Sequence, residues 1–120
     1  MKRDMDLIRL ILLKVEDEYA GAALINLEIE GHDLSEVAIH CEFLKDAGLI
    51  SSCSTSYADN DIYVFSVGNL TWNGTEYLDK IRDRPRWNKI KAIAKEKGIP
   101  LAFESVGEIA LLVAKSAIGT

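Results

Sequence analysis

The apolar and polar positions change their spacing along the chain, and each change predicts a new element. Apolar residues first recur every three or four positions from Asp4, which can cap a helix, to about Glu18. Between Ile25 and Glu30 the spacing becomes two, with apolar residues alternating with polar ones. The opening of the chain is therefore expected to be a helix followed by a half-buried strand.

The middle of the chain predicts a helix followed by a hairpin. A capping-box pattern starts the helix over 33–47, and Gly48 ends it. Serines and β-formers then predict strands over 50–57 and 62–67. The Asx-rich residues 58–61 between them are typical of a hairpin turn.

Three helices are expected in the last part of the chain. Thr71 can cap the first of them, and Pro85 ends it because proline suits the first turn of the next helix, over 86–97. The last helix, Phe103 to Ile118, is apolar on nearly all sides. Two interpretations stay open for its second apolar face, which either forms a homodimer contact or is inserted deeply into its own fold.

Two segments resemble a winged-helix core. Phe43 to Ile50 resembles the end of a recognition helix, where Gly48 supplies the left-handed cap. Leu70 to Leu78 resembles the segment after the wing, with a threonine cap and a glycine, Gly74, that allows close helix packing. The gap between the two segments accommodates one β-hairpin.

A narrower resemblance covers nearly the whole chain. The opening Met1 to Arg9, the strand Ile25 to Gly31, and the residues from Leu70 to Lys89 look like domain-of-unknown-function family 2513, common in bacteria and their phages. The resemblance implies a bacterial or prophage origin and a winged-helix-like fold, and it brings no established activity. The expected fold class is α+β, a winged-helix-like core (helix, strand, helix, β-hairpin wing) followed by C-terminal helices. We expect a single domain over 1–120, with the core over 1–84 and a C-terminal helical extension over 85–120.

The charge of the chain is unevenly distributed. The net charge is −5, yet residues 1–78 carry 5 Lys and Arg against 14 Asp and Glu, whereas residues 79–97 carry 8 against 3. Because non-specific affinity for nucleic acid comes mainly from basic groups, the acidic part argues against a general nucleic-acid binder.

The predicted strand over 25–30 also argues against DNA binding. It occupies the place of the supporting helix that a helix-turn-helix needs before its recognition helix.

Phosphate contacts, if any, are expected from the basic segment. The candidate phosphate-binding residues are Arg82, Arg84, Arg86 and Lys89, with Trp87 among them to stack a base. Alternatively, these residues form a solvated face whose charges pair with the acidic part of the chain.

No residue pattern predicts catalysis or a metal site. His40 and Cys41 are adjacent on a helix and point about 100° apart, and no C-x-x-C spacing occurs. We expect a buried thiol beside an exposed imidazole, no cofactor and no enzymatic activity. The candidate partner-binding residues are Glu36, Ile39, His40 and Phe43, which share one stripe of the second helix.

Localisation and function are inferred by exclusion. Acidic Asp4 and Asp6 do not fit a signal peptide, and the longest apolar stretch, Ile109 to Ala114, is much shorter than the roughly 20 residues of a membrane span. We expect a cytoplasmic protein with no membrane partner. The leading hypothesis is a phage or prophage accessory or regulatory protein that binds a protein, either itself or a host or phage protein. The alternative is a DNA-binding transcriptional regulator.

Overall fold

The chain forms an α+β structure that divides into two compact units. The computed structural model describes residues 2–118, with side chains as far as Lys115. Contacts group the chain into Met1–Thr75 and Glu76–Thr120. The first unit carries 5 Lys and Arg against 13 Asp and Glu, and the second carries 9 against 6. The boundary thus separates an acidic unit from a basic one, and the single domain with a core over 1–84 stays a prediction.

Helix α1 spans Met5–Glu18, as predicted. The Asp4 carboxylate caps it by accepting hydrogen bonds from the backbone N–H groups of Asp6 (3.0 Å) and Leu7 (3.1 Å). These bonds satisfy amides that have no partner within the helix. The buried face is wider than one stripe and includes Met5, Leu7, Ile8, Ile11, Leu12 and Val15.

Strand β1 is shorter than the predicted strand over 25–30, because it covers only Leu24–Ile25. Asn26 has a positive φ of 49° and turns the chain out of the strand. Its backbone N–H still donates to the Phe65 carbonyl (2.8 Å), and its Oδ1 accepts from the Phe65 N–H (2.9 Å). The alternation remains visible as buried Leu27 and Ile29, whereas Ile25 is 62% exposed. The expected burial of Ile25 is therefore wrong.

Helix α2 spans Leu34–Asp46 and has the predicted ends. The Asp33 carboxylate accepts from the Glu36 N–H at 2.8 Å, and Gly48 has a φ of 75°, which glycine adopts without steric cost. The helix packs against both strands of the hairpin, β2 (Cys53–Ala58) and β3 (Asp61–Val67).

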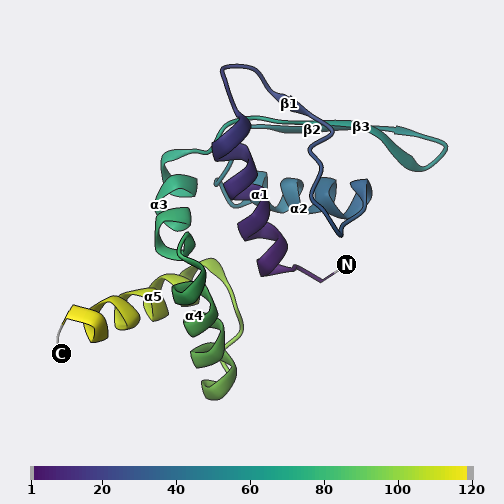
Figure 1. Cartoon of the computed structure of the whole chain (residues 1–120). Coiled ribbons are helices and arrows are strands. Elements are labelled where there is room, and N and C mark those ends of the chain that lie inside the picture. Colours follow the sequence, from purple (N-terminus) through teal and green to yellow (C-terminus); the bar gives the residue numbers. More distant parts are fainter. Residues whose placement is uncertain (1, 119–120) are drawn as a thin grey trace. The chain divides into compact units, whose positions relative to one another are not determined.

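The sheet has the antiparallel order β1-β3-β2. Asp59 and Asn60 both have positive φ, which suits a two-residue hairpin turn, and Ala58 pairs with Asp61. The register shifts from Ser56–Val64 to Tyr57–Ile62, so Tyr63 has no partner opposite it. Beyond β1 the hairpin continues as a two-stranded arm (Figure 1). The predicted hairpin is confirmed, although β2 begins at Cys53 rather than at residue 50.

The start of helix α3, Trp72–Ile81, is joined tightly to the turn after α2. The Thr71 hydroxyl accepts from the Gly74 N–H (3.0 Å), as expected of a cap, and donates to the Gly48 carbonyl (2.5 Å). A Cβ on Gly74 would lie only 2.0 Å from the Leu49 carbonyl oxygen. The prediction that this glycine permits close packing is confirmed.

The second unit is built from the rest of α3 with α4, Arg84–Lys97, and α5, Phe103–Ile118. Asp83 caps α4 through the Arg86 N–H (2.9 Å), so the helix begins two residues before the predicted start. The Tyr77 and Phe103 rings pack edge to face at 4.8 Å. The buried apolar side chains are Tyr77, Leu78, Ile81, Trp87, Ile90, Ala94, Val106, Ile109, Ala110 and Val113.

The predicted bounds of the last helix are confirmed, but its apolar side chains are not all covered. Leu111 and Leu112 are each 58% exposed. The sequence also predicts apolar contacts for Ala117 and Ile118, but their side chains lie outside the described ones, which end at Lys115. Among residues 2–118, no helix is long and apolar enough to cross a membrane.

Candidate functional site

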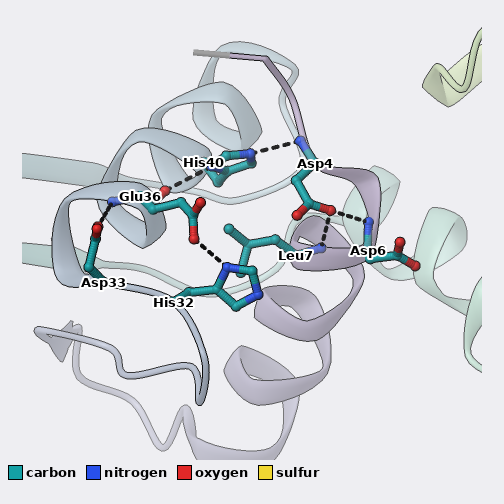
Figure 2. A network of polar contacts seen from close by, with 7 residues as sticks. All are labelled: Asp4, Asp6, Leu7, His32, Asp33, Glu36 and His40. Atoms are coloured by element: carbon teal, nitrogen blue, oxygen red, sulfur yellow. Dashed lines mark hydrogen bonds and ion pairs between the residues drawn. The ribbon is translucent and has the colours of Figure 1, made fainter.

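The stripe of α2 predicted to bind a partner is largely occupied by the protein itself. His40 is fully buried (0% exposed), and its Nε2 accepts a hydrogen bond from the Asp4 N–H at 2.9 Å (Figure 2). Its Nδ1 donates to the Glu36 carbonyl at 2.8 Å. The expected exposed imidazole is therefore wrong, because the segment before α1 lies against α2. In this arrangement His40 is not accessible to a partner.

The other three residues of the stripe are half-buried. Phe43 packs edge to face against the His40 ring at 5.4 Å. The Glu36 carboxylate contacts Nδ1 of His32 (Figure 2). Ile39 lies between Glu36 and Phe43 along α2. The stripe thus offers parts of Glu36, Ile39 and Phe43 at the surface, and partner binding there stays a prediction.

The two cysteines are free thiols in environments that oppose ionisation. Burial, with a smaller contribution from neighbouring Cys53, raises the pKa of Cys41 far above its ordinary value. Burial and the carboxylate of Glu42 raise the pKa of Cys53 to about 11. Because the thiolate is the nucleophile and the metal ligand, both thiols are poorly suited to either role at neutral pH. Within the described residues, no three His, Cys, Asp or Glu side chains are grouped to hold a metal ion.

A groove lined by apolar and mainly acidic side chains runs along α1 in the first unit. We call it the acidic groove; its hollow is about 590 Å³, and it is lined by Leu10, Leu13, Lys14, Asp17, Glu28, Ile29 and Glu30. A second hollow of about 670 Å³ shares Lys14 and the 28–30 segment and reaches His32 and Leu34. The acidic groove is lined by three carboxylates, those of Asp17, Glu28 and Glu30, and by one ammonium, that of Lys14. The Lys14 ammonium lies 3.9 Å from the Glu18 carboxylate.

The acidic groove was not predicted from the sequence. The sequence contains only part of the information needed to find it, namely the alternation of Glu28 and Glu30, which are exposed, with buried neighbours. The groove exists because the chain leaves the sheet at Asn26 and then follows α1 as an irregular segment.

The hairpin arm is a second exposed surface. Tyr57 and Tyr63 are 59% and 72% exposed, and the tip between them carries Asp59 and Asp61. The sequence predicts both tyrosines to lie in strands, over 50–57 and 62–67, but it does not show that they are exposed. The arm has only two strands where β1 no longer pairs with β3, so its side chains lack the neighbours that a complete sheet would supply.

The basic segment of the second unit does not gather its four predicted phosphate ligands into one cluster. Arg82 donates to the Asp79 carboxylate at 2.7 Å, and Arg84 and Lys89 are exposed. Arg86 is half-buried and, being two residues after Arg84 on α4, points roughly 160° away from it. Phosphate binding by these residues stays a prediction.

Trp87 cannot stack a base in this arrangement. Its side chain is only 2% exposed, and the Lys91 ammonium lies 5.6 Å from the ring centroid. The expected stacking role is therefore wrong, since the ring is part of the core between helices of the second unit. Any nucleic-acid contact of the basic segment would therefore rest on its lysine and arginine side chains, without base stacking by Trp87.

Comparisons with known proteins give a family without a described activity. The family model described as "Hypothetical protein (DUF2513)" matches residues 2–100. An uncharacterized protein of Haemophilus influenzae is 37% identical over 111 residues, which cover 92% of each chain. No solved structure matches the chain.

Proposed function

The chain belongs to domain-of-unknown-function family 2513, and we propose that it is a non-enzymatic, cytoplasmic module with a winged-helix-like core. It acts through protein contacts as a phage or prophage accessory or regulatory factor. The acidic groove is the observation that carries the proposal. Its lining combines apolar Leu10, Leu13 and Ile29 with acidic Asp17, Glu28 and Glu30. Such a surface suits a basic protein segment that also presents apolar side chains.

Two further observations support a binding role over a catalytic one. Both nitrogens of His40 are engaged by backbone groups, so the ring has no free acceptor for a substrate proton. The raised pKa values of Cys41 and Cys53 disfavour a thiolate nucleophile. His40 and both cysteines thus have structural surroundings here.

The charge of the acidic groove provides the test. We would immobilise the wild-type chain and the E28K/E30K variant and recover proteins from a lysate of the bacterium that carries the gene. D46K is the matched control, because Asp46 is exposed at the end of α2 and does not line the groove. The expected result is a protein retained by wild type and D46K and lost, by about ten-fold or more, with E28K/E30K. Equal recovery by all three chains would overturn the proposal.

DNA-binding regulation is the alternative, favoured by one observation. The second unit carries more basic than acidic residues, and Arg84, Lys89, Lys95 and Lys97 of α4 are exposed. An electrophoretic shift with genomic fragments at two salt concentrations tests it. A DNA complex that weakens as salt rises, and weakens again in R84E/K89E, would move this alternative to first place.

A further inference from the structure

The outward face of α5 carries a short stripe of exposed side chains. Leu111 and Leu112 lie at its centre and are each 58% exposed, with exposed Glu108 and Lys115 at its ends. These positions follow the spacing i, i+3, i+4, i+7, which places them along one side of a helix. The opposite side is packed in its own unit through Val106, Ile109, Ala110 and Val113.

This stripe has charges arranged so that it can pair with itself. Glu108 and Lys115 lie at equal distances from the midpoint between Leu111 and Leu112. In an antiparallel pair with a two-fold axis at that midpoint, Glu108 of each copy faces Lys115 of the other. A parallel, in-register pair would instead place like charges together. The stripe therefore favours the antiparallel two-fold dimer, in which the same surface of both copies makes the contact.

The surface beside Leu111 adds concave area to the stripe. A hollow of about 290 Å³ is bordered by Ala110, Leu111 and Ala114 of α5. Its remaining border comes from Glu76, Asp79 and Lys80 of α3 and Arg86 of α4. Small side chains allow a second helix to approach closely, and the hollow offers room for an apolar side chain next to Leu111.

We propose that the α5 stripe, Glu108, Leu111, Leu112 and Lys115, is the contact surface of an antiparallel homodimer. Two leucines from each copy are covered at its centre, and a Glu108–Lys115 pair closes each end. The partner is a second copy of this chain, because the charges that flank the leucines complement their own two-fold image. The contact lies in a different unit from the acidic groove, so each proposal can fail without the other.

Light scattering after size exclusion, across a concentration series, tests the dimer. The wild-type chain is expected to approach twice its 13.3 kDa mass as concentration rises. L111E/L112E should remain monomeric with an unchanged far-ultraviolet circular dichroism spectrum, since both leucines are more than half exposed. A wild-type chain that stays monomeric throughout, or a dimer that survives L111E/L112E, would overturn the proposal.

A charge exchange tests the antiparallel register itself. E108K and K115E should each weaken the dimer by several-fold, because each places like charges opposite one another. The double variant E108K/K115E should recover most of the wild-type association, since the complementary pairs re-form with reversed sign. E96K is the matched control on the exposed side of α4 and should leave the association unchanged. Failure of the double variant to recover would contradict this register.

Discussion

The imidazole of His40 accepts a hydrogen bond from the backbone N–H of Asp4 at 2.9 Å, joining residues that are 36 positions apart in sequence. Asp4 is also the cap of α1, and His40 lies in the middle of α2. One buried side chain thus holds the beginning of the first helix against the second. Because the same ring donates to the Glu36 carbonyl, both of its nitrogens contribute to this junction.

Replacing His40 should destabilise the first unit substantially. His40→Ala leaves the partly buried Asp4 N–H without its acceptor and opens a void between α1 and α2. We therefore expect a loss of about 2–4 kcal/mol in unfolding free energy. Urea denaturation measures it. His32→Ala is the control, because His32 is half-buried and its contact with Glu36 is a partly exposed i, i+4 pair worth under about 1 kcal/mol. Equal losses in the two variants would contradict this role of His40.

Gly74 should tolerate no side chain. A methyl group there would lie 2.0 Å from the Leu49 carbonyl oxygen, which is backbone and cannot rotate away. We expect Gly74→Ala to cost about 3 kcal/mol or more in unfolding free energy. Gly107→Ala is the matched change, since its Cβ would meet only the Lys80 ammonium at 3.6 Å. That variant should gain up to about 1 kcal/mol from helix propensity, and a similar cost at both sites would refute the steric argument.

The hydroxyl of Tyr77 should be dispensable for stability. It is buried and has no hydrogen-bond partner among the described residues, while its ring packs on Phe103. Tyr77→Phe is therefore expected to leave stability unchanged or raise it by about 1 kcal/mol. Tyr77→Leu loses the aromatic contact and should cost about 1–2 kcal/mol. A marked loss in thermal or urea stability with phenylalanine would show that the hydroxyl has a partner.

The stability of the protein should fall in alkaline solution. Burial raises the pKa of Cys53 from 9.0 to about 11, and it also raises the pKa values of Cys41 and Tyr77. The folded chain therefore holds these protons more tightly than the unfolded chain. The stabilisation is fully present below the unfolded pKa and is lost as pH rises through the folded pKa.

Urea midpoints measured between about pH 8 and pH 11 check this dependence. For Cys53 the decline should begin near pH 9 and continue to about pH 11. Cys53→Ala should make the decline less steep, whereas Ser54→Ala, at an exposed neighbouring position of β2 with no group that titrates in this range, should leave the slope unchanged. A midpoint that stays constant over this range, or a slope unaffected by Cys53→Ala, would contradict the expected linkage.

The candidate surfaces were harder to predict than the elements that carry them. The sequence identified Glu36, Ile39, His40 and Phe43 as neighbours on one stripe, which is correct, but it could not show that Asp4 covers His40. It likewise identified the basic segment without showing that Trp87 is buried. The acidic groove depends on Asn26, whose bonds to Phe65 span 39 residues. No local pattern records such a contact.

The sequence by itself determined the order of the elements and most of their ends. Asp4, Asp33 and Thr71 cap their helices and Gly48 takes a left-handed conformation, because capping depends on residues only a few positions apart. Only the tertiary structure decided which residues face solvent. Exposure depends on what the rest of the chain places against a side chain, and this buried His40 and Trp87 while leaving Tyr63 and Leu111 open.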